Sequence, residues 1–518
     1  MRIQNPVLAG FHPDPSILRV GEDYYLATST FEWCPGVVVH HSRDLVHWRR
    51  LGGVLDEPRL LDVTGVPDSG GVWAPDLTYA NGRFHLVFSV LDNYAFGYKD
   101  LRNYLTTAPS VDGPWSDPVP LHGRGFDAAL FHDDDGATWL LSMAFDSRVG
   151  KGFAGIEIQR LVDGALVGPP RKIFAGTGIG VTEGPHLYRV GDWYYLMVAE
   201  GGTGYEHGVT VARSRDLFGP YEPDPAGPML TARHDPELAL QKAGHGCLVA
   251  TGSGEWYLSH LAARPYTTRG RCVLGRETAL QRVEWVDGWP RVPGGVPALE
   301  VPAPIARKGP FLTHSDIRGP FLALGVEWST LRRHAAADWL AVSGDSVRIQ
   351  GGQSPYGLRS PSLVARPVTD RRCALDATVD FRPTNVHQAA GITAYYNTRT
   401  WYFLSVTTEG VVLVGSDRGA RRELWRRDGV TGPVRLRVEL DGPVLRFALA
   451  PGDTGGSGWE PVPVELDATT LSDEYADEIV DGQVRSFGFT GAFVGLWVQD
   501  LSNEGVVAAY SGVRYRAG

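Results

Sequence analysis

The sequence predicts an all-β protein in which a five-bladed β-propeller is followed by a C-terminal β-sandwich. Three observations support this prediction: a segment that recurs five times in the first half, alternating apolar and polar residues in the second half, and few helical patterns between the repeats. The 518 residues exceed what one hydrophobic core usually holds, so we expect two domains, over residues 1–300 and 311–518.

Each copy of the repeat starts with a polar residue, continues through a strand and a Gly- or Asp-containing turn, and ends in alternating aromatic and apolar residues. The copies are "DPSILRVGEDYYLATS", "DLTYANGRFHLVFS", "DAALFHDDDGATWLLSM", "EGPHLYRVGDWYYLMVA" and "HGCLVATGSGEWYLSH". Their leading residues are Asp14, Asp76, Asp127, Glu183 and His245, spaced by 62, 51, 56 and 62 residues. This period fits a four-stranded propeller blade, whereas a TIM barrel would need helices of about ten residues between its strands.

The five leading residues are expected to converge, because the first strand of each blade lines the central channel of a propeller. Four carboxylates and one imidazole would then share one small space. Asp14 stands between two prolines, which restrict its backbone. An isolated Pro-Asp-Pro would be interpreted as a turn, but its equivalence with four other polar residues favours a functional site.

The second half begins after a segment that predicts a linker. Pro and Gly crowd without periodicity over residues 287–310, where the propeller is expected to end. Alternating runs such as "CALDATVDFRP" and "PVRLRVELDGPVLRFALA" then indicate the strands of a two-sheet antiparallel domain.

Composition excludes several classes of partner. The formal charge of −10 argues against nucleic acid, which is bound by clustered Lys and Arg. No apolar stretch approaches 18 residues, and the first residues lack a secretory pattern, so we expect a cytoplasmic protein with no membrane partner. Cys34, Cys247, Cys272 and Cys373 share no CxxC spacing and are interpreted as buried free thiols.

Several long segments, in order, resemble glycoside hydrolase family 43, specifically its two-domain β-xylosidases. They include "NPVLAGFHPDPS", "GVWAPDL", "TEGPHLY", "RGRCVLGRETALQRVEW" and "FTGAFVGLWVQDLS", and the resemblance covers essentially the whole chain. It implies an exo-acting, inverting hydrolase that removes terminal β-D-xylose from short xylo-oligosaccharides, with α-L-arabinofuranosidase activity as a second expectation.

By this resemblance Asp14 is the general base, Glu183 the general acid, and Asp127 a third carboxylate that tunes the pKa of the acid and positions the substrate. Hydrolysis of a glycosidic bond needs an acid to protonate the leaving oxygen and a base to activate water. Arg276, in "GRET", matches the family's active-site arginine. Asp76, in "WAPD", is either an axial structural residue or a substrate contact.

Aromatic residues are expected to wall the sugar pocket. Phe31 and Trp73 match such residues of the family, and Phe493 in "GAFVG" matches one that a sandwich loop contributes, so the second domain would help to close the pocket. Phe145 stands where a tryptophan is frequent, and Ala128–Ala129 replaces a common Pro-Ser. These departures put substrate preference in question rather than activity.

His245, in "AGHGC", matches an axial histidine that in related enzymes is associated with a bound cation or a water cluster. A buried histidine without metal is the alternative. The chemistry is expected to need no cofactor, and the expected metal is a structural divalent cation such as calcium. The expected partners are a xylo-oligosaccharide or arabinoside and, as in related dimers and tetramers, further copies of the chain.

Two other functions stay open. A retaining fructoside hydrolase shares the propeller and three acids, but that group usually shows an Asn-Asp-Pro-Asn opening and a Cys beside the acid, where this chain has "HPDPS" and "TEGP". A carbohydrate-binding lectin generally repeats its site in each blade, whereas the leading residues here differ and are expected to converge on one site.

Overall fold

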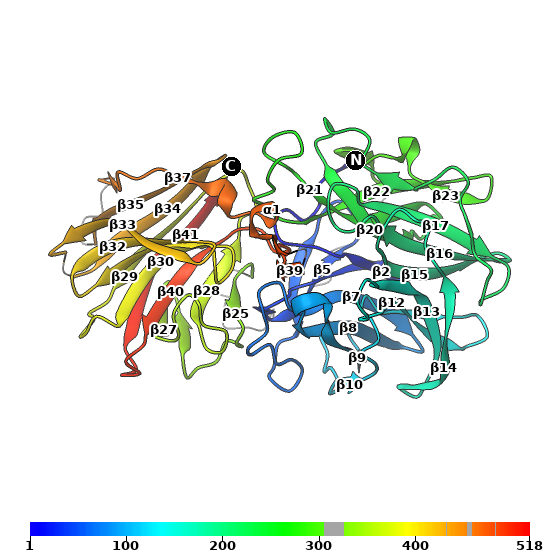
Figure 1. Ribbon diagram of the computed structural model, residues 1–518, viewed down its shortest axis with the longest axis horizontal. Coiled ribbons are helices and arrows are strands. Elements are labelled where there is room, and N and C mark those ends of the chain that lie inside the picture. The colour runs from blue at the N-terminus through cyan, green and yellow to red at the C-terminus, as the bar shows by residue number, and fades with distance from the viewer. Residues whose placement is uncertain (305–325, 431, 453–457, 482) are drawn as a thin grey trace.

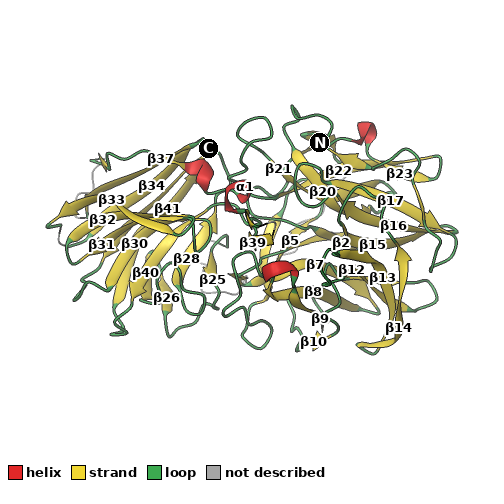
Figure 2. Cartoon of the chain, in the orientation of Figure 1, coloured by secondary structure: helices red, strands yellow, loops and turns green. Residues whose placement is uncertain are grey.

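The computed structural model describes residues 1–304, 326–430, 432–452, 458–481 and 483–518. Almost all of its regular structure is strand (Figure 2). Two bodies lie side by side, one from the blue-to-green half of the chain and one from the yellow-to-red half (Figure 1). None of the helices in the described residues is long and apolar enough to span a bilayer.

The first body consists of five antiparallel sheets in the described residues. The first contains β2 (Ser16–Val20), β3 (Asp23–Thr28), β5 (Gly36–Ser42) and β6 (Arg49–Leu55). The second contains β7 (Gly71–Ala80), β8 (Arg83–Asn93), β9 (Asp100–Ala108) and β10 (Val119–Pro120), and the third β11 (Ala129–His132), β12 (Thr138–Phe145), β13 (Phe153–Val162) and β14 (Ala165–Phe174). The fourth contains β15 (Thr182–Val190), β16 (Trp193–Glu200) and β17 (Gly208–Ser214), with β18 (Glu222–Pro223) and β19 (Leu230–Thr231) both on β17. The fifth contains β20 (Gln241–Ala250), β21 (Trp256–Ala263), β22 (Glu277–Val286) and β23 (Trp289–Arg291).

The first strands of these sheets form a closed ring, which makes the body a five-bladed β-propeller. β2 contacts β7, β7 contacts β11, β11 contacts β15, β15 contacts β20, and β20 contacts β2. Apolar residues fill the space between neighbouring blades; Tyr25 and Val39 of the first blade pack with Leu77 and Phe84 of the second. The repeat found in the sequence therefore corresponds to one blade.

The predicted linker is wrong for residues 289–302. They supply β23, the outer strand of the fifth blade, and β24 (Glu300–Pro302), which pairs with β1 (Arg2–Gln4). Pro290 is tolerated because an outer strand has one edge without a hydrogen-bonded neighbour. The Asn5 side chain ties the chain start to the fifth blade by bonding the backbone of Leu280 in both directions, at 2.7 and 2.9 Å. The predicted start of the second domain, residue 311, lies outside the described residues.

The second body is a sandwich of two antiparallel sheets. One contains β33 (Ala420–Asp428), β32 (Gly410–Asp417), β31 (Trp401–Thr407), β30 (Gln388–Tyr395), β40 (Phe493–Asp500), β28 (Ser362–Pro367) and β25 (Ser329–Leu331). The other contains β26 (Leu340–Ser343), β27 (Ser346–Gln350), β41 (Val507–Ala517), β29 (Arg372–Asp380), β34 (Val434–Asp441), β35 (Val444–Pro451) and β36 (Glu460–Pro461), with β37 (Leu466–Asp467) on β35. The short helix α1 (Asp473–Ala476) and the hairpin β38 (Glu478–Val480) and β39 (Gln483–Ser486) face the propeller (Figure 1).

The two bodies share a sheet and part of a core. β4 (Trp33–Cys34), which lies in the propeller half of the sequence, pairs with β25 and extends the first sandwich sheet. The Trp33 ring stacks on Phe493 of β40, with centroids 4.0 Å apart. All four cysteines are buried free thiols, as predicted.

Candidate active site

A pocket lies where the five blades meet. Asp14, Asp127, Glu183 and His245 line it, from the first, third, fourth and fifth blades. About 370 Å³ of its space, mouth included, is free of protein atoms, a size typical of small-molecule sites. Four of the five leading residues of the repeat are therefore together, as predicted.

The backbone at these positions is unusual. Asp14 and Asp127 each lie two residues before the first strand of a blade, β2 and β11, and have a φ of 54°. His245, in β20, has a φ of 48°. These values lie in the left-handed region, which Asp and His tolerate better than most residues. A residue before proline is expected to be extended, so Asp14 differs from that expectation. Because Asp127 has the same φ without a following proline, blade geometry accounts for it better than the prolines do.

Asp14 is buried and held by three neighbours. The Ser29 hydroxyl donates to Oδ2 at 2.7 Å, Arg276 Nη1 donates to Oδ1 at 3.1 Å, and His245 Nδ1 lies 3.7 Å from Oδ1. Burial alone would raise the pKa of Asp14, but Arg276, His245 and the Ser29 hydrogen bond together hold that pKa below its usual value. Asp14 is therefore an ionised carboxylate near neutral pH.

Glu183 is the second residue of β15, and its pKa is shifted in the direction opposite to that of Asp14. Burial and the negative charge of Asp14 raise its pKa to about 7, although Arg276 and Lys99 act in the other direction. Near neutral pH a large share of Glu183 is therefore protonated and able to donate a proton.

Asp127 accepts a hydrogen bond from the backbone N–H of Gly184, the residue after Glu183, at 3.0 Å. Burial, Glu183 and Asp14 raise the pKa of Asp127 well above its usual value. Because electrostatic coupling is mutual, Asp127 and Glu183 each disfavour the ionisation of the other. A neutral Asp127 carboxyl can donate a hydrogen bond to a sugar hydroxyl.

Arg276 connects the general base position to the second domain. Besides Asp14, it donates from Nη1 to the Thr203 hydroxyl at 3.1 Å and from Nε to the Phe489 carbonyl at 3.3 Å. Its guanidinium carbon lies 5.3 Å from the Phe31 ring centre and 4.8 Å from that of Phe489. Its Nη2 atom is buried without a hydrogen-bond partner in the described residues, so it offers a donor to a sugar hydroxyl.

Aromatic rings form the pocket walls. Phe31 and Trp73 line it as predicted, together with Phe126 and Phe489. Rings of this kind offer apolar surface to the faces of a sugar. Phe489 lies in the loop before β40, so the sandwich domain contributes one residue to the pocket wall.

The placement of Phe493 in the pocket wall is wrong. Phe493 is 1% exposed and stacks between domains on Trp33, so its ring belongs to the shared core. Phe489, four residues earlier in "FTGAF", takes the expected place. The difference arises because the backbone enters β40 at Phe493, while the loop before that strand reaches the propeller.

Two departures from the family pattern also lie outside the pocket lining. Ala128 is buried between blades with Val87 and Leu130, so its small size fits the propeller core. Phe145 is half-buried, and its ring centre lies 5.1 Å from Lys99 Nζ. The same Nζ lies 5.9 Å from the ring centres of the pocket residues Trp73 and Phe126.

Sequence reasoning missed Lys99, Phe126, Thr203 and Phe489. Phe126 directly precedes Asp127, and that adjacency is a signal that could have identified it. Lys99 and Thr203 lie in loops whose sequence carries no comparable signal.

Asp76 lies in the axial structure and not in the pocket lining. It accepts hydrogen bonds from the Ser16 hydroxyl at 3.1 Å and the Leu130 N–H at 2.8 Å, and His186 Nδ1 lies 3.6 Å away. These partners belong to the first, third and fourth blades. Of the two roles that the sequence left open, the contacts favour the structural one.

His245 is a buried imidazole on the pocket lining and is the candidate ligand for a cation. Burial lowers its pKa to about 4, so the ring is neutral near neutral pH and one nitrogen keeps a lone pair. Within the described ranges, however, no group of three or more His, Cys, Asp or Glu side chains could hold a metal ion. The described residues around His245 therefore do not form a metal site built from protein side chains.

Both domains of the chain are similar to known proteins. Residues 3–290 match the Glycosyl hydrolases family 43, and residues 322–516 match the Beta xylosidase C-terminal Concanavalin A-like domain. The chain is 40% identical over 544 residues to the beta-xylosidase of Bacillus subtilis (strain 168), with 100% of both chains covered. It is 41% identical over 533 residues to the xylosidase/arabinosidase 43B of Humicola insolens, with 99% of this chain and 98% of that protein covered.

The fold is likewise shared with a solved structure. The crystal structure of xylan beta-1,4-xylosidase from Bacillus halodurans C-125 superposes with a TM-score of 0.92 at 43% identity, covering 99% of this chain and 100% of that one. The similarity thus extends over both the propeller and the sandwich. The protein belongs to glycosyl hydrolase family 43.

Proposed function

We propose that the protein is an exo-acting β-xylosidase that removes terminal β-D-xylose from short xylo-oligosaccharides with inversion, as the family does. The observation that supports this proposal is that the pKa values of two carboxyls in one pocket are shifted in opposite directions. The pKa of Asp14 is lowered and that of Glu183 is raised to about 7. Near neutral pH they therefore provide the ionised base and protonated acid that glycoside hydrolysis requires.

The proton movements follow from these two states. Asp14 accepts a proton from a water molecule, whose oxygen attacks the anomeric carbon on the face opposite the leaving group. As the glycosidic C–O bond breaks, Glu183 gives its proton to the leaving oxygen. Solvent then takes the proton from Asp14 and returns one to Glu183. Attack from the opposite face makes the released xylose the α anomer.

The pocket walls support removal of one terminal sugar. Phe31, Trp73, Phe126 and Phe489 surround the carboxylates, and Phe489 adds a wall from the second domain. The buried Nη2 donor of Arg276 suits a sugar hydroxyl. A similar protein is named xylosidase/arabinosidase, so we propose terminal α-L-arabinofuranose as a second substrate. Membership of family 43 and the convergence of four leading residues on one pocket remove the support for the fructoside hydrolase and lectin alternatives.

Xylotriose labelled at its reducing end tests the exo action. We expect unlabelled xylose and labelled xylobiose as the first products. Labelled xylose as the first product would contradict attack at the non-reducing end. Glu183→Gln tests the acid: it should lose most activity on xylobiose but much less on an activated aryl xyloside, whose leaving group needs little protonation. Full activity of this variant on both substrates would refute the assignment.

Three further proposals concern the setting of the reaction. The steps above use no cofactor, and we propose that a divalent cation such as calcium, held mainly through water beside His245, has a structural role. We also propose that the enzyme acts in the cytoplasm on imported oligosaccharides and forms a homo-oligomer. Calcium titration followed by calorimetry, cell fractionation, and light scattering test these three statements separately.

A further inference from the structure

One serine of the propeller bonds to the backbone of the sandwich loop that reaches the pocket. Ser69 lies just before β7 and is 1% exposed. Its hydroxyl donates to the Phe487 carbonyl at 3.0 Å and accepts from the Phe489 N–H at 3.2 Å. The rings of Phe487 and Phe489 are stacked with centroids 4.8 Å apart. A single hydroxyl therefore bonds on both sides of Gly488.

The backbone of Ser69 reaches two other parts of the pocket wall. Its carbonyl accepts from Trp73 Nε1 at 2.9 Å, and its N–H donates to Glu32 Oε2 at 3.1 Å. Glu32 follows Phe31 in the chain, and both Trp73 and Phe31 line the pocket. Ser69 has a φ of 57°, a strained value for serine that these hydrogen bonds help to maintain.

The position of Phe489 also bears on the general base. Arg276 donates to the Phe489 carbonyl and to Asp14, so one guanidinium joins the loop to the carboxylate. A shift of Phe489 would change both an aromatic wall and a hydrogen bond of this arginine.

Most other side chains that hold the loop belong to the sandwich. The Gly488 N–H donates to Asp477 at 2.7 Å, and the Gly491 N–H donates to Asp473 at 3.0 Å. From the propeller, Tyr94 accepts a longer bond of 3.4 Å from the Phe487 N–H. The Ser69 contacts, at 3.0 and 3.2 Å, are thus shorter than those that Tyr94 and Arg276 of the propeller make to this segment, at 3.4 and 3.3 Å.

We propose that Ser69 is a positioning residue that sets Phe489 against Trp73 and Arg276 and so determines the affinity for the terminal sugar. The inference deepens the proposed function and rests on it. Ser69 acts through Phe489 and touches no reacting atom.

Two substitutions of Ser69 distinguish an effect on sugar affinity from a general loss of folding stability. Ser69→Ala and Ser69→Gly both remove the hydroxyl, but glycine also relieves the left-handed backbone and should yield the more stable variant. We expect both to raise KM for xylobiose by about three- to tenfold, because the loss of both hydroxyl hydrogen bonds leaves Phe489 less firmly positioned. The rate constant kcat should change by less than about twofold, the pattern expected when uniform binding is lost. Amide exchange over residues 486–491 should accelerate in both.

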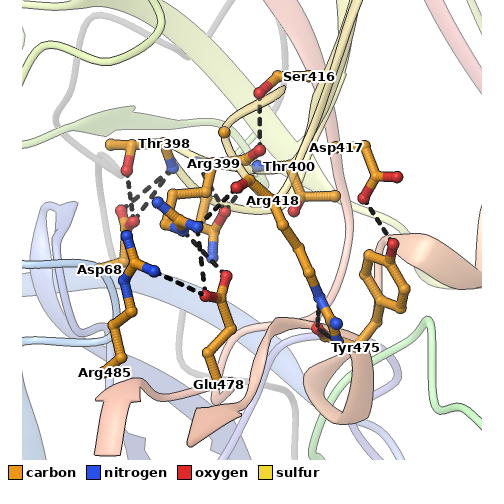
Figure 3. Close-up of polar contacts among 12 residues, drawn as sticks. Asp68, Thr398, Arg399, Thr400, Ser416, Asp417, Arg418, Tyr475, Glu478 and Arg485 are labelled. Carbon is orange, nitrogen blue, oxygen red and sulfur yellow. Dashed lines mark hydrogen bonds and ion pairs between the residues drawn. The ribbon is translucent and has the colours of Figure 1, made fainter. Parts of the chain in front are cut away.

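Thr398→Val is the matched control. The Thr398 hydroxyl donates to Asp68 Oδ2 at 2.5 Å, so this variant removes an interdomain hydrogen bond beside Ser69 that does not touch the loop (Figure 3). In the same view, Glu478 and Arg399 form a further polar contact near this junction. We expect Thr398→Val to keep the KM and the amide exchange of the unsubstituted protein.

The inference would be overturned by an unchanged KM in both Ser69 variants, by the same KM increase in all three variants, or by unchanged amide exchange in the loop. A KM increase that follows the loss of stability, larger for Ser69→Ala than for Ser69→Gly, would also contradict it. Failure of the unsubstituted protein to release xylose would instead refute the proposed function. Amide exchange in the loop is measured without substrate, so these two failures are distinguishable.

Discussion

Arg276→Met should move both limbs of the pH profile of kcat/KM to higher pH. Activity requires an ionised Asp14 and a protonated Glu183, so the acid limb reports the pKa of Asp14 and the alkaline limb that of Glu183. Arg276 lowers the pKa of both groups. Removing its charge therefore raises both pKa values, and the alkaline limb should move above its expected position of about pH 7.

The size of the shift can be bounded from the contact. Arg276 Nη1 lies 3.1 Å from Asp14 Oδ1. An opposite charge at about 4 Å contributes about 4 kcal/mol at an effective dielectric constant of about 20, which corresponds to about 3 pKa units. The Ser29 hydrogen bond persists in the variant, and water can enter the space that the guanidinium leaves. We therefore expect the acid limb to rise by about 1–2 units.

The assay is initial-rate hydrolysis of xylobiose at low substrate concentration across the pH range. Only the positions of the limbs are compared, because Arg276 also lines the pocket and its loss should lower the whole profile. Arg215→Gln is the control, since Arg215 is exposed on the propeller and pairs with Asp192 at 3.6 Å. An acid limb of Arg276→Met that stays within about 0.3 units of the control would refute the electrostatic reasoning.

Three other predictions test separate parts of the account. The pKa of Glu183 is raised in the folded protein, so between its usual value and about 7 the native state binds more protons than the unfolded state, and stability falls as pH rises. Glu183→Gln should therefore gain on the order of 1–2 kcal/mol of unfolding free energy at about pH 8 and little at about pH 4. Equal gains at the two pH values would contradict this prediction. Phe489→Ala should raise KM at little cost in stability, whereas Phe493→Ala should lose about 3–5 kcal/mol of unfolding free energy. Denaturant titrations and kinetics on both variants show which residue belongs to the pocket wall and which to the hydrophobic core. Chelation with EDTA should lower the unfolding temperature and leave the pH limbs in place, and a displaced alkaline limb would show that a cation acts on Glu183.

Much of the fold and of the site could be predicted because the propeller repeats. Equivalent positions in successive blades identified Asp14, Asp127, Glu183 and His245 before any distance was known. Asp76 shares that equivalence but bonds to neighbouring blades, and only its hydrogen-bond partners distinguish it from the others. Periodicity therefore locates the axis of the propeller and leaves the level of each residue along it undetermined.

Features that depend on loops and on contacts between domains could not be predicted in the same way. Phe489 and Phe493 are both apolar and four residues apart, and the point at which β40 begins decides which one lines the pocket. β4 has two residues, too few to give a pattern, and its pairing with β25 joins segments almost 300 residues apart. Pro290 in β23 obscured a strand because outer strands tolerate proline.

The stereochemistry of the first product tests the central claim most directly. The protein would be mixed with xylobiose, and the anomeric protons would be followed by NMR from the first minute, before mutarotation mixes the anomers. The account predicts α-xylose as the first product, because water activated by Asp14 attacks opposite the oxygen that Glu183 protonates. β-Xylose as the first product would contradict the account, since Asp14 would then act as a nucleophile in a retaining mechanism.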